Sequence, residues 1–322
     1  MNKEYNSNAK KQEQNIWTKP FVLAVVAIFC CALWGSAFPA IKLGYRWFDI
    51  ESSASNTQIL FAGCRFALAG VLTICIGSVL SGKVLKPQKT SWKKIFILSC
   101  FQTSVHYTCF YIGLAHTTGV KSSILNGMNV FLAIFIAAIL FRQEKLTVVK
   151  VLGSMLGFAG IILINLSDHG FDLDFHLMGE GMIVLSSLCY GMSSALIRVY
   201  GKNENSVMLS GYQFAVGGLI MILIGWMLGG RLEVWNKQGI LVLLYLAFVS
   251  AVAYTLWAML LRYNDVSKVA IYGCFNPIFG ALLSATILQE TGQTFGVKEG
   301  IALGLVSVGI MIVQGKKGKT HE

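Results

Sequence analysis

Charged residues and prolines are scarce in this chain. Of its 322 residues, 13% are charged and four are proline, whereas 55% are hydrophobic and 33 are glycine. A soluble domain of this length carries about 25% charged residues, so the composition excludes an ordinary soluble globular protein. The mean hydropathy of +0.64 indicates a protein that lies in a membrane. Many glycines and few prolines fit packed helices better than the strands of a β-barrel, which would alternate apolar and polar residues.

Long hydrophobic runs divide the chain. A bilayer core about 30 Å thick requires roughly 20 apolar residues for each helix that crosses it. Ten such runs, here called spans 1 to 10, cover residues 20–43, 58–81, 93–114, 119–141, 146–166, 177–200, 206–228, 239–262, 265–288 and 297–314. The sequence therefore predicts an all-α polytopic membrane protein with ten transmembrane helices. Short connections leave no room for a sizeable aqueous domain, and polar tails are expected at residues 1–19 and 315–322.

Positive charge is unevenly distributed between the connections. The net charge of +11 could indicate a nucleic-acid partner, but its placement favours another explanation. If the N-terminal tail is cytoplasmic, the cytoplasmic segments hold nineteen lysines and arginines and the opposite side holds six. This imbalance follows the positive-inside rule, so we expect a multi-pass protein of the cell membrane with both termini cytoplasmic and no nucleic-acid partner. The basic loop at residues 83–94 is expected to lie against anionic lipid headgroups.

Acidic residues are absent from the middle of every span. All fifteen carboxylates lie in tails, loops or near predicted helix ends, which disfavours a carrier that exchanges protons for cationic drugs at a central carboxylate. A membrane-embedded enzyme would need clustered carboxylates, a metal-binding set or a large polar loop, and the sequence has none of these. The eight cysteines lie inside spans without metal-ligand spacing. We therefore expect apolar packing cysteines, no metal, no cofactor and no enzymatic activity.

The chain contains an internal repeat. Residues 105–114, VHYTCFYIGL, return 147 positions later as VAYTLWAMLL at residues 252–261. Further pairs at similar offsets are Arg65 with Gln213, Phe66 with Phe214, Phe131 with Phe279, Trp34 with Tyr190, and Lys42 with Arg198. Internal similarity in an apolar chain is typical of a duplicated membrane fold, and such duplications usually build transporters. The repeats are predicted at residues 20–166 and 177–314.

Five spans in each repeat determine how the two repeats are oriented. An odd number of crossings makes the second copy enter the membrane from the other side. The repeats are therefore expected to be inverted, with a shared site near the midplane and alternating access between the halves. Loop charges agree with this, because the connection between spans 2 and 3 has five lysines whereas its counterpart mixes Arg231, Glu233 and Lys237.

Several short motifs follow one another in a fixed order. They are Trp34-Gly35-Ser36 with Lys42, Arg65-Phe66, Gly179-Glu180, and Asn276-Pro277-Ile278-Phe279 before Glu290, together with glycine-rich spans 5 and 10. Over residues 20–314 this set resembles the EamA-type members of the drug/metabolite transporter superfamily. The resemblance implies a transporter of small metabolites, amino-acid-like or other small organic solutes, often exported. The chain departs from the family at Asn129, where proline is usual, so span 4 is expected to be less bent than span 9.

One arginine, Arg65, and one histidine, His106, lie inside spans and away from their ends. Arg65 lies about eight residues into span 2, roughly 12 Å from its end. Because charges at membrane depth are costly, each is a functional candidate. Arg65 lacks an intramembrane acid, so it either binds an anionic substrate group or acts as a helix-packing or snorkelling arginine. His106 either takes up a proton near neutral pH or stays neutral and hydrogen-bonded.

Aromatic residues recur at equivalent positions of the two halves. Tyr107 and Tyr254 are each followed three residues later by an aromatic ring, Phe110 or Trp257, on the same helix face. Rings with a hydroxyl supply the apolar area and polar groups that a small-metabolite pocket needs, and packing or lipid-facing aromatics are the alternative.

Amides complete the candidate site. Asn126 and Asn129 lie one turn apart in span 4, where they either bond across helices or line the cavity, because bare amides in lipid are costly. The predicted substrate-binding residues are Trp34, Arg65, His106, Tyr107, Asn129, Tyr190, Gln213, Tyr254, Trp257 and Asn276. The sequence thus predicts a transporter of a small-molecule substrate in the lipid bilayer. A channel-like facilitator is the alternative, and a lipid-modifying membrane enzyme is less favoured. The glycines of spans 5 and 10 permit close contact inside a monomer, the preferred interpretation, or between two protomers.

Overall fold

All ten predicted spans are helical in the computed structural model, which describes residues 16–143, 145–166, 175–201, 204–234, 236–264, 269, 271–288 and 296–315. The α-helices are α2 (Pro20–Trp47), α3 (Ser55–Ser81), α4 (Ser91–Leu98), α5 (His106–Ala115), α6 (Gly119–Asn126), α7 (Met128–Phe135), α8 (Val148–Asn165), α9 (Met182–Tyr200), α10 (Ser206–Met227), α11 (Lys237–Tyr263), α13 (Phe275–Leu288) and α14 (Val297–Gly315). Within the described residues, eight helices are long and apolar enough to cross a membrane, and Tyr272–Leu288 is a shorter apolar helix. The prediction of an all-α polytopic membrane protein is confirmed.

Four spans are not uniform α-helices. Span 3 contains a π-helical segment, η1 (Ser99–Val105), between α4 and α5, and span 6 opens with another, η3 (Leu177–Gly181). Span 4 is interrupted at Gly127 between α6 and α7 and ends in π-helical η2 (Ile136–Leu140). Span 9 contains the 3-10 helix η4 (Ile271–Cys274) directly before α13. Since spans 4 and 9 are both interrupted, the expected difference in their bend stays a prediction.

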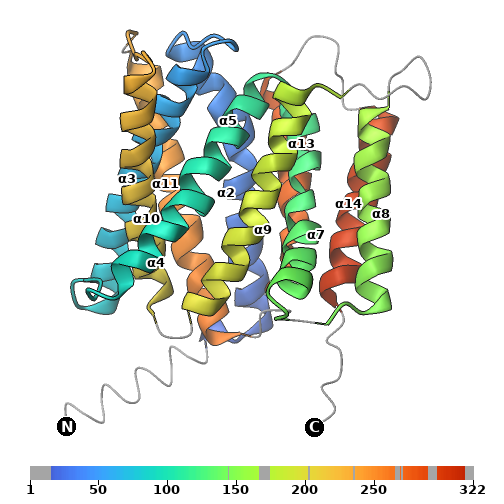
Figure 1. The fold of residues 1–322 in the computed structure, drawn as a ribbon. Helices are drawn as coiled ribbons and strands as arrows, with labels where there is room; N and C mark the ends of the chain where they lie inside the picture. Colours follow the sequence, from blue (N-terminus) through green and yellow to red (C-terminus); the bar gives the residue numbers. More distant parts are fainter. Residues whose placement is uncertain are drawn as a thin grey trace, which may run out of the picture.

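The helices form one bundle in which successive spans run in opposite directions (Figure 1). α2 begins at Pro20 at one end of the bundle and finishes at Trp47 at the other, and these are called the Pro20 end and the Trp47 end. At the Pro20 end, Asn264 Nδ2 after α11 donates to the Trp17 carbonyl at 3.0 Å. At the Trp47 end, Asn236 Nδ2 before α11 donates to the Trp47 carbonyl. α2 and α11 are therefore antiparallel neighbours along their whole length.

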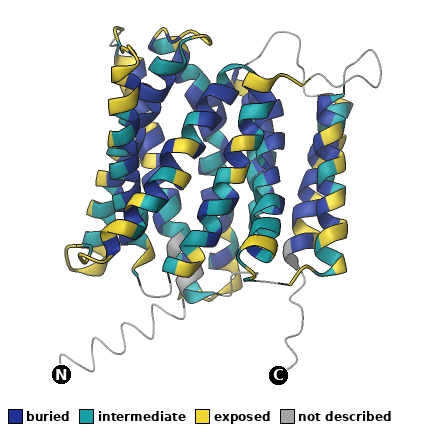
Figure 2. Ribbon diagram, viewed as in Figure 1, coloured by how far each residue is buried: buried dark blue, intermediate teal, exposed yellow. Residues whose placement is uncertain are grey.

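The outer surface of the bundle is rich in large apolar side chains. Buried residues line the interior of the bundle, and exposed residues face outward or lie at its ends (Figure 2). Val79, Val148, Leu177 and Val297 are each at least 74% exposed. Apolar surface of this extent marks a membrane-facing protein, because lipid rather than water covers it.

Glycines bring equivalent helices of the two repeats into contact. A Cβ atom added at Gly309 of α14 would lie 2.8 Å from the backbone nitrogen of Gly157 in α8. A Cβ atom added at Gly63 of α3 would lie 2.9 Å from the carbonyl oxygen of Gly218 in α10. These small-residue faces therefore serve close packing inside the chain.

Two more pairs of helices meet across the repeats at equivalent positions. They are called the α5–α9 seam and the α2–α11 seam. In the α5–α9 seam, His106 Nδ1 lies 2.8 Å from Ser186 Oγ. In the α2–α11 seam, Cys30 Sγ donates to the Ala253 carbonyl at 3.7 Å. Ser186 and Ala253 stand at the repeat offsets of Cys30 and His106, so both seams place the same positions in contact, as two inverted copies of one fold require.

Candidate functional site

The two equivalent tyrosines meet in the interior of the bundle. The hydroxyl oxygens of Tyr107 in α5 and Tyr254 in α11 lie 3.2 Å apart. The Tyr107 ring lies 3.9 Å from Phe66, and the Tyr254 ring packs edge-on against Phe214 at 4.8 Å between centroids. Phe66 and Phe214, which are also equivalent in the repeats, lie 5.5 Å apart. These four rings are called the tyrosine junction, and they lie where the two repeats meet.

Trp34 of α2 extends the junction on one side. Its indole packs edge-on against Tyr254, with centroids 5.4 Å apart, and against Trp257, with centroids 5.1 Å apart. The buried Nε1 of Trp34 has no hydrogen-bond partner among the described residues. Because buried donors in proteins are normally paired, this N–H is a group that water or a ligand can satisfy.

His106 and Tyr190 lie on the other side of the junction. The His106 ring is 4.4 Å from the Tyr107 ring and 5.8 Å from the Tyr190 ring. His106 Nδ1 lies 2.9 Å from the Ser186 carbonyl oxygen, which can only accept, so the geometry assigns the proton to Nδ1. The His106 ring is therefore buried and hydrogen-bonded, and its proton uptake near neutral pH stays a prediction.

Arg65 is buried and bonded to two neighbouring helices. Its Nε donates to the Leu246 carbonyl at 3.2 Å, its Nη1 to the Tyr111 hydroxyl at 2.6 Å and its Nη2 to the Ser250 hydroxyl at 3.0 Å. Its guanidinium carbon lies 4.7 Å from the centre of the Phe66 ring. Arg65 thus joins α3 to α5 and α11 instead of extending toward the membrane surface. The contacts favour a helix-packing arginine, yet its three hydrogen-bond partners are neutral and no counter-ion is found for it in the described part of the chain.

Gln213 makes the contact equivalent to that of Arg65. Its Oε1 accepts a hydrogen bond from Thr103 Oγ1 at 2.6 Å. Thr103 and Gln213 stand at the repeat offsets of Ser250 and Arg65, so the same pair of positions is bonded in each half. Gln213 Nε2 is buried and lacks a partner among the described residues. The Oε1 atom of Gln213 therefore contributes to helix packing, whereas its Nε2 donor is unpaired among the described residues.

Among the described residues, the side chains of Asn129 and Asn276 make no hydrogen bond to the tyrosine junction. Asn129 Nδ2 donates to Asn126 Oδ1 at 2.7 Å, so this amide bonds within its own span and not across helices. The Oδ1 atoms of Asn129 and Asn276 are buried without a partner in the described part of the chain. Both are acceptors that a donor on a ligand or a water could satisfy.

Tyr111 was missed by the sequence interpretation. It lies one turn after Tyr107 on the same helix face, and its ring is 6.5 Å from that of Tyr107. Its hydroxyl accepts from Arg65, and its carbonyl accepts from the Tyr45 hydroxyl at 2.9 Å. The four-residue spacing from Tyr107 was the available signal, because such residues are neighbours on a helix.

The described residues offer few groups that could bind a metal ion. The eight cysteines are all free thiols. Within the described ranges, no three His, Cys, Asp or Glu side chains are grouped as a metal site would require.

Two five-helix repeats around a buried junction define a membrane-transport architecture. The EamA-like transporter family model matches residues 22–166 and 177–314, and the chain belongs to this family. It is thus a member of the drug/metabolite transporter superfamily, as the sequence motifs indicated.

Several relatives match over nearly the whole chain. An uncharacterized transporter of Bacillus subtilis, YvbV, is 24% identical over 92% of this chain and 93% of its own length. An uncharacterized transporter of Archaeoglobus fulgidus is 27% identical over 93% of this chain and 99% of its own length. A WAT1-related chloroplastic protein of Arabidopsis thaliana is 23% identical over 85% of this chain and 66% of its own length. One crystal structure aligns with a TM-score of 0.63 and 17% identity, over 92% of this chain and 96% of that one, which shows the shared fold.

Proposed function

We propose that this transporter moves small organic metabolites, amino-acid-like or of similar size, out of the cell by alternating access. The tyrosine junction and the side chains around it form the substrate site. The contact between Tyr107 and Tyr254 carries the proposal, because it places equivalent residues of inverted repeats against each other. In transporters built from inverted repeats, substrate sites lie at the repeat interface near the midplane.

The unpaired polar atoms support a binding role. Trp34 Nε1 and Gln213 Nε2 are donors, and Asn129 Oδ1 and Asn276 Oδ1 are acceptors, all buried without a partner among the described residues. An unpaired buried polar group costs about 1–3 kcal/mol, so such groups persist where water or a ligand pairs with them. The aromatic walls favour an apolar or planar portion on the cargo.

Charge around the junction disfavours cationic cargo. Within the described ranges Arg65 donates to neutral groups, and its guanidinium carbon lies 6.0 Å from the centre of the Tyr107 ring. A buried positive charge without a counter-ion attracts anions and repels cations through the low-dielectric interior. We therefore assign neutral, zwitterionic or anionic solutes as the cargo class, with Arg65 acting through its field and through the position of Tyr111.

Cytoplasmic termini follow from the charge asymmetry and put the Trp47 end of the bundle outside the cell. A cysteine at Lys89, which is exposed in the connection between α3 and α4, tests this orientation. The matched control is a cysteine at exposed Ser52 in the connection between α2 and α3. In intact cells an impermeant maleimide should label the Ser52→Cys variant and leave the Lys89→Cys variant unlabelled. The reverse pattern would show that the protein is inserted the other way.

Metabolite profiling tests the function directly. Cells that overexpress the chain should accumulate one or a few small solutes in the medium, and deletion cells should retain the same solutes. A Tyr107→Ala, Tyr254→Ala double variant at equal membrane abundance is the control for indirect effects. If this variant changes the medium as the native protein does, the junction is not the site. Saturation of the flux and exchange across proteoliposomes separate a carrier from a channel-like facilitator.

A further inference from the structure

A buried ion pair joins the two repeats at the Trp47 end of the bundle. Lys121 lies in the first turn of α6, in the first repeat, and Glu180 lies in η3, at the start of the second. The Lys121 Nζ and Glu180 Oε1 atoms are 3.0 Å apart, and the two residues are 7% and 2% exposed. From the sequence, Lys121 was counted only among the six cations opposite the cytoplasm and Glu180 was noted as part of the Gly179-Glu180 motif, and their pairing was not predicted.

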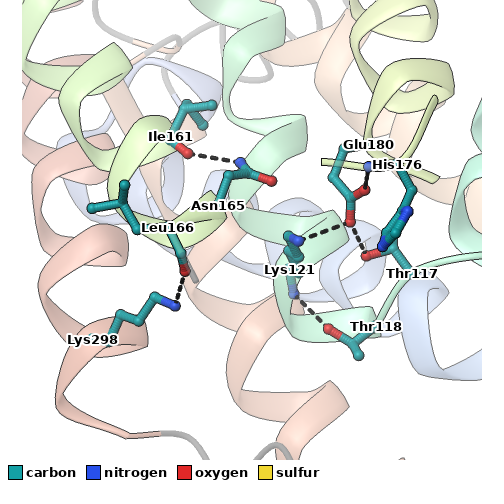
Figure 3. Close-up of polar contacts among 9 residues, drawn as sticks. All are labelled: Thr117, Thr118, Lys121, Ile161, Asn165, Leu166, His176, Glu180 and Lys298. Atoms are coloured by element: carbon teal, nitrogen blue, oxygen red, sulfur yellow. Dashed lines mark hydrogen bonds and ion pairs between the residues drawn. The ribbon is translucent and has the colours of Figure 1, made fainter. Parts of the chain in front are cut away.

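Further hydrogen bonds hold the Glu180 carboxylate. Thr117 Oγ1 donates to its Oε1 at 2.7 Å, and the His176 backbone N–H donates to its Oε2 at 2.8 Å. Figure 3 shows Lys121, Thr117 and His176 converging on this side chain. A buried ion pair is maintained only when its geometry and additional hydrogen bonds offset the cost of desolvation. If the helices separated, water would reach the two charges and remove the cost of desolvation. We therefore expect two states, one in which the pair is closed and dry and one in which the two charges are apart and hydrated.

Close backbone packing lies directly below the ion pair. A Cβ atom added at Gly113 of α5 would lie 2.9 Å from both the Gly179 carbonyl oxygen and Ile183 Cγ1. The α5–α9 seam thus continues from the His106–Ser186 contact, beside the tyrosine junction, up to the Trp47 end of the bundle. Separating this seam would connect the junction with the Trp47 side of the membrane.

The equivalent α2–α11 seam is closed differently. At its Pro20 end the described side chains include an apolar cluster of Leu23, Ala27, Leu260 and Val269. Ala27 and Leu260 stand at the repeat offsets of Ile183 and Gly113, so this cluster occupies the position that the glycine contact occupies in the α5–α9 seam. Among the described residues, an apolar cluster therefore lies at the Pro20 end of the α2–α11 seam, and an ion pair lies at the Trp47 end of the α5–α9 seam.

We propose that the Lys121–Glu180 ion pair is a latch that closes the α5–α9 seam at the Trp47 end and separates when the site opens to that side. The proposal rests on the alternating access of the proposed function. It adds that, among the described residues, an ion pair lies at the end of one seam and an apolar cluster at the end of the other, so that the charges at positions 121 and 180 set the balance between open and closed states.

A reversible cross-link tests whether the seam moves. A Cβ atom at Gly179 would lie 3.5 Å from Thr117 Cβ, within the range of about 3.5–4.5 Å that disulfides need. Thr117→Cys with Gly179→Cys is placed in a chain whose eight native cysteines are replaced by alanine. Oxidation should lower transport at least about tenfold, and reduction should restore it, whereas oxidation should not affect either single variant. Equal transport by oxidised and reduced protein would mean that the seam stays closed during the cycle and would overturn the latch.

A labelling experiment tests the latch without relying on transport. Ile183 is 0% exposed below the ion pair, so Ile183→Cys in the same cysteine-free chain reports opening of the seam. Lys121→Met with Glu180→Gln removes both charges and avoids leaving one buried alone. In this background an impermeant maleimide applied from the Trp47 side should label position 183 at least about tenfold faster. Applied from the other side, it should not.

Exchange of the two charges is the matched control. Lys121→Glu with Glu180→Lys should return labelling of position 183 toward the slow rate while membrane abundance stays equal. Labelling at one rate with the pair present, removed and exchanged would overturn the latch. If charge changes the labelling rate but metabolite profiling finds no transported solute, the proposed function fails and the latch stands. If transport is demonstrated but the seam does not open, the latch fails and the proposed function stands.

Discussion

The hydroxyl oxygens of Tyr107 and Tyr254 lie 3.2 Å apart, although each belongs to a different repeat. Equivalent residues of an inverted repeat can touch only near the axis that relates the two copies. The contact therefore lies near that axis, and Phe66 and Phe214 lie beside it as a second equivalent pair. A substrate bound here would meet both halves at once, as alternating access requires.

Alanine at Tyr107 or Tyr254 is expected to impair transport while the protein still reaches the membrane. Each substitution removes an aromatic wall of the junction, so we expect flux to fall at least about tenfold. Phenylalanine removes only the hydroxyl contact and should cost about 0.5–1.5 kcal/mol in affinity or stability. Substrate flux and membrane abundance are measured together.

Phe248→Ala is the matched control for the tyrosine variants. Phe248 is an aromatic residue of the same helix, α11, and is 48% exposed on the outside of the bundle. Its removal should leave flux unchanged. Normal flux in both tyrosine variants would place the site elsewhere.

Arg65→Gln is expected to destabilise the protein. The Arg65 guanidinium donates three hydrogen bonds to α5 and α11, and glutamine cannot reproduce them. We expect a stability loss of roughly 2–4 kcal/mol, seen as a lower unfolding temperature in detergent, together with lower membrane abundance and lower transport. Arg65→Lys keeps the charge but lacks the planar fork, so it should rescue only partly.

A direct substrate contact by Arg65 makes a different prediction. The Gln variant would then be well expressed and would lose transport of anionic or zwitterionic solutes while sparing neutral analogues. Comparing three solutes of similar size and different charge in one preparation separates the two roles. An unchanged substrate profile in a stable Gln variant would remove Arg65 from the site.

Gly35→Ala is expected to disturb the packing of α2 on α13. An added Cβ would lie 2.5 Å from Phe279 Cβ and 2.8 Å from the Gly280 backbone nitrogen, and neither can move without shifting a helix. Overpacking of this kind costs about 1–3 kcal/mol. At Gly304 nothing lies within 4 Å of an added Cβ, so Gly304→Ala is the control and should unfold at the native temperature. Equal unfolding temperatures for both variants would contradict the close contact at Gly35.

Hydropathy alone predicted the ten spans, because a bilayer demands long apolar runs whatever their tertiary partners. It did not predict the interruptions at η1, Gly127 and η4, because these depend on contacts with other helices. The repeat offset predicted that Tyr107 and Tyr254 are equivalent, and the structure adds that they touch. Equivalent residues touch each other only where they lie near the symmetry axis, and the position of that axis cannot be predicted from the sequence.

The sequence did not predict which side chains from distant segments contact each other. Arg65 was recognised as a costly buried charge, but Leu246 and Ser250, its partners on α11, belong to the other repeat. The Lys121–Glu180 pair was missed for a related reason. Each residue alone is typical of a helix end, and only the packing of η3 against the start of α6 buries them together.

A second ion pair between the two repeats, Lys94 with Glu204, predicts how stability depends on pH. At the Pro20 end, Lys94 Nζ lies 2.8 Å from Glu204 Oε1, and the Ser91 hydroxyl donates to the same carboxylate at 2.9 Å. The hydrogen bond from Lys94 is the main cause that lowers the pKa of Glu204 below its ordinary value of 4.5. A carboxylate with a lowered pKa stabilises the folded state fully above its unfolded pKa, and this stabilisation is lost as the pH falls through the folded value.

We therefore expect the native protein and the Glu204→Gln variant to differ in unfolding temperature by a constant amount between about pH 8 and pH 5.5. The difference should shrink below about pH 4.5, where the carboxylate takes up a proton. Because the Lys94 side chain is 28% exposed, added salt should reduce the difference as well. Thermal unfolding of both proteins in one detergent over this range provides the measurement. A difference that grows on acidification would mean that Glu204 is protonated in its folded environment at neutral pH, and the ion pair would then be excluded.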